Sequence, residues 1–223
     1  MDINFWNERW DKEEIAFHMN EVNPMLIKHF PKLSLEEQKR IFIPLCGKTL
    51  DIEWLLAKNY KIVGVELNEL AVKSLFIELN IKPTILELND FIIYKHEDIE
   101  IFVGDFFNLS KVVLGNVDLV YDRAALVALP KDMRKDYSSH LQKITSGSSQ
   151  LLLTYEYDQN IMKGPPFCVD SLEVAEYYFN AYSLILLEEN QNLPKGLKRK
   201  SNGSEKIWLL KDDKKFKRRD NEN

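Results

Sequence analysis

The sequence predicts an α/β protein with an open, doubly wound and mostly parallel sheet. From Arg40 onward, short β-rich runs alternate with helical patterns, which is typical of right-handed βαβ crossovers that cover both faces of a sheet. The chain has 223 residues and is 45% hydrophobic, enough to bury one substantial core. We therefore expect one domain over residues 1–211.

The expected elements follow in chain order. Residues 1–33 predict an N-terminal helical segment. The runs at 91–94 and 99–103 predict a hairpin near the third strand, with "KHED" at its turn. The seven expected strands of the main sheet are 41–44, 61–65, 84–88, 117–121, 150–155, 182–187 and 206–210. The four expected helices are 50–58, 69–79, 131–145 and 171–179.

The end of the chain departs from this alternation. Only residues 188–205 connect the last two strands, too little for a helical crossover, so these strands should pair antiparallel. The tail at 212–223 mixes both charges with one aromatic residue and should be disordered.

Composition disfavours several classes of protein. The net charge of −5 and a pI near 5.5 argue against a nucleic-acid-binding protein. No apolar stretch approaches the roughly 20 residues that cross a bilayer, and the first twenty residues do not resemble a secretory signal. Two cysteines favour a reduced, cytoplasmic setting. None of the four histidines has a metal-ligand spacing, so we expect no metal site.

A glycine and an acid follow the first two expected strands. Gly47 lies in "PLCGK", where the absence of a Cβ lets a ligand approach the backbone at the start of a helix. Glu66 closes the next strand, at a spacing typical of an acid that accepts hydrogen bonds from ribose hydroxyls. The pattern lacks the other glycines of a dinucleotide site, which disfavours a dinucleotide and leaves a nucleoside without phosphate as an allowed ligand. The alternative is an ordinary strand–turn–helix with a solvated glutamate.

Two further strand ends carry candidate residues. In "VGDFFNL", Asp105 could accept a hydrogen bond from an exocyclic amine and Phe106 could cover a base, or Asp105 could simply cap a short helix. In "VDLVYDRAALVALP", Arg123 could pair with an anionic substrate. Asp122 is expected to form a surface pair with Arg123 that contributes little.

Five short motifs in this order resemble the thiopurine S-methyltransferase family over nearly the whole chain, to about Leu210. They are "FWNERW" with "FH", "PLCGK", "GVE", "DRAALVAL" and "GPPF". The resemblance implies S-adenosyl-L-methionine as cofactor and the seven-stranded, Rossmann-like sheet of class I methyltransferases, with the last strand antiparallel. One departure is Ala124, since relatives often have glycine at this position.

The resemblance also implies the site residues. Cofactor contacts would fall to Trp10 and its neighbours, to Leu45, to Glu66 at the ribose and to Arg123, with Asp105 and Phe106 on the adenine side. Trp6, Trp10 and Phe17 could form a lid over the cofactor, and Gly47 a close backbone contact. Arg123 could also favour a substrate thiolate, and "GPPF" could shape the rim of the acceptor pocket.

The expected function is therefore S-methylation of small aromatic or heterocyclic thiols by a monomer. One alternative is a relative acting on halide, bisulfide, selenium or tellurium species. Another is a regulatory protein that binds the cofactor without catalysis.

Overall fold

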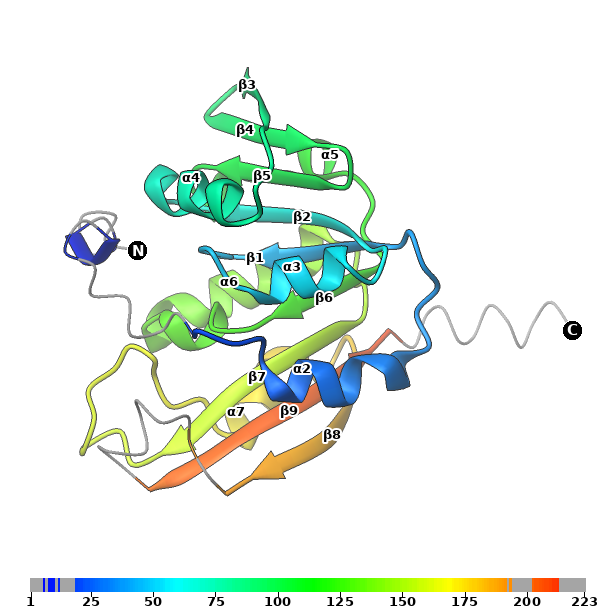
Figure 1. Cartoon of the computed structure of the whole chain (residues 1–223). Coiled ribbons are helices and arrows are strands. Elements are labelled where there is room, and N and C mark those ends of the chain that lie inside the picture. The colour runs from blue at the N-terminus through cyan, green and yellow to red at the C-terminus, as the bar shows by residue number, and fades with distance from the viewer. Residues whose placement is uncertain are drawn as a thin grey trace, which may run out of the picture. The chain divides into compact units, whose positions relative to one another are not determined.

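The computed structural model describes residues 6, 8–10, 12, 19–191, 193 and 202–212. The chain divides into two compact units, Met1–Val117 and Asp118–Asn223. The described part of the chain has nine strands, and all nine of the β-rich runs predicted from the sequence form one (Figure 1). The α/β class is confirmed, with both parallel and antiparallel pairs, and the hairpin at 91–96 and 99–103 adds two strands to the seven expected.

The first unit holds a sheet in the order β3-β4-β5-β2-β1. Strands β1, β2 and β5 are parallel to one another, and β4 is antiparallel to β3 and β5. Helices α3 and α4 pack against β2 (Figure 1). The elements are α2 (Pro24–His29), η1 (Phe30–Leu33), β1 (Arg40–Pro44), α3 (Asp51–Leu56), β2 (Lys61–Glu66), α4 (Glu69–Glu78), β3 (Thr84–Leu88), β4 (Phe91–His96), β5 (Ile99–Val103), η2 (Phe106–Asn108) and α5 (Lys111–Leu114).

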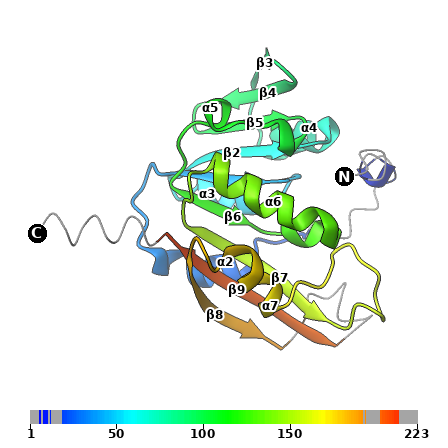
Figure 2. The same ribbon diagram turned by 180° about the vertical axis from the view of Figure 1, so that it is seen from behind.

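The second unit holds strands in the order β6-β7-β9-β8. Strands β6 and β7 are parallel, whereas β9 is antiparallel to both of its neighbours. The short connection before β9 predicted its antiparallel pairing with β8. Figure 2 shows α6 and α7 on the same side of these strands. The elements are β6 (Leu119–Asp122), η3 (Leu126–Ala128), α6 (Lys131–Ile144), β7 (Gln150–Tyr157), α7 (Ser171–Tyr178), β8 (Ser183–Asn190) and β9 (Gly203–Lys211).

Burial explains which strands form the centre of the first sheet. Strands β1 and β2 are buried along almost their whole length, as expected for apolar runs covered on both faces. Strand β3 differs, because all five of its residues are exposed and it pairs only with β4. The run at 84–88 is therefore an outer strand, and β5 takes the place beside β2 that the third strand was expected to occupy.

Some predictions about the chain ends fall outside the described residues. Trp6 and residues 8–10 are helical, as are Pro24–His29, and Lys12 lies in a turn, but the other residues of 1–18, including Phe17, are not described. The same holds for 213–223, so a disordered tail stays a prediction. Asp212 had been assigned to that tail, yet it is buried and its amide donates to Ser149 Oγ at 3.0 Å.

Candidate active site

The turn after β1 has an unusual backbone. Leu45 has a φ of 47° and Gly47 a φ of 53°, so two of three consecutive residues are in the left-handed region. A leucine in this conformation is strained, and such strain tends to occur at functional sites. The turn is anchored to the neighbouring strand, because the amide of Cys46 donates to the carbonyl oxygen of Val65 at 3.1 Å. The Leu45–Gly47 backbone is therefore held close to the carboxyl end of β2.

Glu66 joins the ends of β1 and β2 through its side chain. Its Oε2 accepts a hydrogen bond from the Gly47 amide at 2.8 Å, and its Oε1 accepts one from the Asn68 amide at 2.9 Å. The carboxyl is 7% exposed. Burial raises the pKa of Glu66, and the backbone N–H groups of Asn68, Gly47 and Leu67 oppose that rise. The glycine and the acid picked out by their spacing are thus in direct contact.

These contacts leave Glu66 able to accept more hydrogen bonds. The carboxylate offers about four lone-pair positions in all, and the hydrogen bonds from the Gly47 and Asn68 amides occupy two of them, with the Leu67 N–H also close by. A pair of ribose hydroxyls could use the remaining positions. The acceptor oxygens at this edge therefore fit the sugar hydroxyls of a nucleoside cofactor such as S-adenosylmethionine.

Trp10 lies against the same turn. A Cβ built on Gly47 would be 3.3 Å from Cζ2 of Trp10, so the indole ring covers the glycine backbone. Trp6 lies one helical turn earlier and is partly buried. The structure therefore brings Trp10, Gly47 and Glu66 together, while Phe17 lies outside the described residues.

Asp105 and Phe106 follow β5, which is parallel to β2 and pairs with it. Asp105 caps the short helix η2, since its Oδ1 accepts a hydrogen bond from the Phe107 amide at 3.0 Å. This is the capping role considered from the sequence, and the side chain remains partly exposed. Phe106 is only 2% exposed and packs edge-to-face with Phe107 at 5.4 Å between ring centroids. Little of its ring is accessible to a base.

The cysteine in this turn is not an activated nucleophile. Cys46 is buried, and burial together with the nearby Glu66 raises the pKa of its thiol well above the ordinary value. A protonated, buried thiol acts as a small packing group rather than as a nucleophile.

The second unit presents Asp122 and Arg123 at the end of β6. Asp122 is fully buried. Its Oδ2 accepts a hydrogen bond from the Tyr137 hydroxyl at 2.7 Å, and its Oδ1 accepts one from the Leu126 amide at 3.1 Å. Burial raises the pKa of Asp122 to about 6. The prediction that Asp122 forms a surface pair with Arg123 was wrong, because Asp122 is buried. Asp122 instead fixes the turn that contains the partly exposed Arg123.

Ala124 has a φ of 70°, which explains why glycine suits this position. The left-handed conformation costs a residue with a Cβ about 1 kcal/mol or more. We expect Ala124→Gly to raise the free energy of unfolding by about 1 kcal/mol, measured by urea denaturation. The matched control is Ala125→Gly, because Ala125 has an ordinary φ of −85°. This replacement should lower the free energy of unfolding. Equal effects of the two replacements would contradict this explanation.

The described residues lack two kinds of feature. No group of three or more His, Cys, Asp or Glu side chains in this part of the chain is arranged to hold a metal ion. Among the same residues, no helix has the length and apolar character needed to cross a bilayer.

Solved structures share the fold. An S-adenosylmethionine-dependent methyltransferase from Anabaena variabilis matches with a TM-score of 0.63 at 11% identity, covering 94% of each chain. A 1,6-didemethyltoxoflavin-N1-methyltransferase from Burkholderia thailandensis, solved with S-adenosylhomocysteine, matches with a TM-score of 0.62 at 13% identity, covering 94% of this chain and 86% of its own. The fold is that of the class I methyltransferases, and the glycine–glutamate geometry suits their cofactor.

Curated relatives define the family. Residues 1–213 match the thiopurine S-methyltransferase family. Thiopurine S-methyltransferases from Teredinibacter turnerae and Acinetobacter baylyi are each 44% identical to this chain; they cover 94% of it, and 97% and 98% of their own lengths. The chain belongs to the thiopurine S-methyltransferase family. It is therefore an enzyme, a methyltransferase whose cofactor is S-adenosylmethionine.

Proposed function

We propose that this enzyme methylates small aromatic or heterocyclic thiols of the thiopurine type. Its family membership supports this acceptor class, since the relatives are named for it. The hydrogen bond from the Gly47 amide to the Glu66 carboxyl supports a cofactor site at this edge of the sheet. We propose further that the enzyme acts as a cytoplasmic monomer on small molecules and does not bind nucleic acid.

The residues of the first unit would hold the nucleoside part of the cofactor. Glu66 would accept hydrogen bonds from the ribose hydroxyls, and the Leu45–Gly47 backbone would lie close beside the sugar. On the adenine side, Asp105 could accept a hydrogen bond from the exocyclic amine through the oxygen lone pairs that its capping role leaves available. Phe106 would contribute an edge of its buried ring.

The N-terminal tryptophans would exclude water from the reacting groups. S-Adenosylmethionine supplies a methyl group on a positively charged sulfur, and its transfer to a thiolate cancels two charges. A dry surface favours such a loss of charge more than water does. Trp10 and Trp6 would provide that surface, to which we propose that Phe17 contributes, and an indole face attracts a cation by roughly 0.5–2 kcal/mol.

Arg123 would stabilise the acceptor as a thiolate. A cation beside a thiol favours the charged form and lowers the pKa of the thiol. Replacing Arg123 with alanine is therefore expected to raise the pH at which the methylation rate is half-maximal. Arg123→Lys keeps the charge and should keep the pH profile close to wild type. Identical pH–rate profiles for wild type and Arg123→Ala would rule out this role.

The acceptor class is tested by methyl transfer from a labelled donor to a panel of acceptors. We expect turnover of 6-mercaptopurine and thiophenols, and little or none of iodide or a selenium oxyanion. Preference for iodide or selenium would instead support the alternative of a smaller acceptor pocket. A thermal shift with S-adenosylmethionine but no transfer to any member of the panel would support a regulatory protein.

A further inference from the structure

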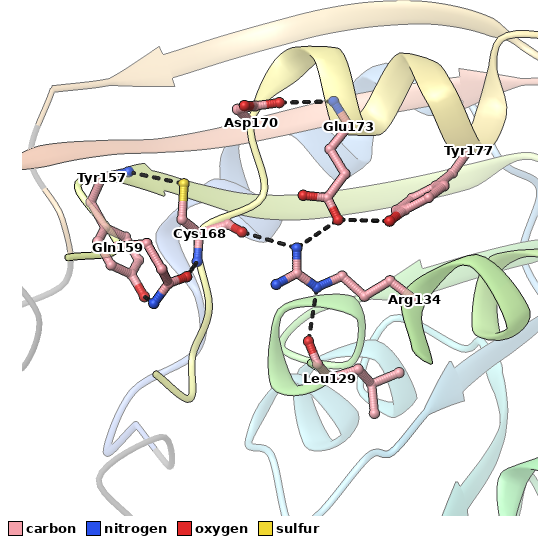
Figure 3. A network of polar contacts seen from close by, with 8 residues as sticks. All are labelled: Leu129, Arg134, Tyr157, Gln159, Cys168, Asp170, Glu173 and Tyr177. Atoms are coloured by element: carbon pink, nitrogen blue, oxygen red, sulfur yellow. Dashed lines mark hydrogen bonds and ion pairs between the residues drawn. The ribbon is translucent and has the colours of Figure 1, made fainter. Parts of the chain in front are cut away.

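A buried arginine in the second unit joins two segments that are far apart in the sequence. Arg134 in α6 is 3% exposed, and its Nε donates to the carbonyl oxygen of Leu129 at 2.8 Å. Its Nη1 donates to the carbonyl oxygen of Cys168 at 3.0 Å (Figure 3). Leu129 ends the turn that follows Arg123, and Cys168 comes directly after the "GPPF" segment at 164–167. One side chain therefore ties these two segments together.

Glu173 holds Arg134 in this position. The Nη1 of Arg134 also donates to Oε1 of Glu173 at 2.6 Å, and the same oxygen accepts a hydrogen bond from the Tyr177 hydroxyl at 2.8 Å (Figure 3). Glu173 lies in the first turn of α7, and its amide donates to Oδ1 of the helix cap Asp170 at 2.8 Å. Glu173 is thus held at its backbone amide and at its carboxylate. The carboxylate neutralises the buried charge of Arg134.

The "GPPF" segment is held at further points. The amide of Phe167 donates to the carbonyl oxygen of Val127 at 2.6 Å, and the Tyr157 hydroxyl donates to that of Pro166 at 2.5 Å. The guanidinium carbon of Arg134 lies 5.6 Å from the centroid of the Phe167 ring. Residues 164–168 all remain partly exposed. The segment is therefore a fixed surface that a small molecule can contact.

We propose that Arg134 and Glu173 are positioning residues for acceptor binding. The guanidinium is planar, with donors in a rigid fork, so it sets both the separation and the orientation of the two carbonyl groups it binds. Those carbonyls belong to the turn that presents Arg123 and to the segment that could form the rim of the acceptor pocket. The inference rests on the proposed function, because it assumes that these two segments contact the thiol.

A double variant separates positioning from stability. Arg134→Met with Glu173→Leu removes both buried charges together and fills their space with apolar atoms, a change that folded proteins often tolerate. It also removes the link between Leu129 and Cys168. We expect the KM for an aromatic thiol to rise about tenfold, because small displacements at a binding surface have large kinetic effects. The Kd for S-adenosylhomocysteine should stay unchanged, and the amides of Phe167 and Cys168 should exchange with solvent faster.

Two further variants complete the experiment. Arg134→Lys keeps a charge near Glu173 but lacks the planar fork that sets the orientation of both carbonyls, so its KM should be intermediate. This variant decides the question if the double variant does not fold. Lys206→Met removes another buried charge, whose hydrogen bonds and ion pairs go to Glu156, Ser171 and Glu189 rather than to residues 164–168. It should leave the KM unchanged.

A folded double variant with the wild-type KM would overturn the positioning role, as would an equal rise of KM in Lys206→Met. A wild-type enzyme that methylates no thiol would overturn the proposed function first, and this inference with it, before any variant is compared.

Discussion

Replacing Glu66 with glutamine is expected to weaken the binding of S-adenosylmethionine about a hundredfold. Hydrogen bonds to a charged group contribute roughly 1.5–3 kcal/mol each, and about 1.4 kcal/mol corresponds to a factor of ten in affinity. Glutamine has the same size as glutamate, but it lacks the charge and offers one acceptor oxygen instead of two. Isothermal calorimetry with S-adenosylhomocysteine measures the change in Kd directly.

The Glu66→Gln variant should still fold, but one of the Gly47 and Asn68 amides loses its acceptor, because glutamine offers a single oxygen. A matched control is Glu69→Gln, since Glu69 lies three residues later and its carboxyl binds Tyr94 and Lys73 rather than the Gly47 turn. Glu69→Gln should keep the wild-type Kd. If both variants bound the cofactor as wild type does, Glu66 would not be the ribose-binding residue.

The second large effect is expected at Gly64, in the middle of β2. A Cβ at this position would lie 2.8 Å from Cys46 Sγ and 2.8 Å from Ile101 Cδ1, both buried. Contacts this short force side chains out of their preferred positions and cost about 1–3 kcal/mol. We expect Gly64→Ala to lower the free energy of unfolding by that amount and, because Cys46 adjoins Gly47, to weaken cofactor binding as well.

A compensating change distinguishes this overlap from a backbone effect. Cys46→Ala removes the sulfur atom that the new methyl group would meet. The double variant Gly64→Ala with Cys46→Ala should therefore be more stable than the two single effects added together predict. Strict additivity in urea denaturation would show that the sulfur contact is not the cause.

Local patterns in the sequence were sufficient to predict most of the elements. Apolar runs placed β1 and β2, and the short connection before β9 predicted its antiparallel pairing. The spacing of Gly47 and Glu66 placed both residues at one sheet edge, because parallel strands end together. These features depend on residues that are close in the sequence or on general rules of sheet topology.

Other features depend on residues that are distant in the sequence. The run at 84–88 contains Ile85, Leu86 and Leu88 and resembles a buried strand, yet it lies exposed because β5 pairs with β2 instead. Asp122 was expected at the surface, because nothing in its neighbourhood indicates that the Tyr137 hydroxyl would reach it in the interior.

The contact between Arg134 and Glu173 was also missed. The two residues are 39 positions apart and lie on different helices. The pattern Asp170-x-x-Glu173 is a recognisable helix cap, and it predicts where α7 begins. It does not predict that the Glu173 side chain binds an arginine of another helix. A sequence signal existed for the helix, but none existed for the ion pair.

The most direct test of the account is a crystal structure of the enzyme with S-adenosylhomocysteine bound. We predict that both ribose hydroxyls lie within hydrogen-bonding distance of the Glu66 carboxylate, with the Gly47 turn beside the sugar and the Trp10 indole close to the sulfur. A ribose that contacts other side chains, with Glu66 still bound only by the amides of Gly47 and Asn68, would contradict it.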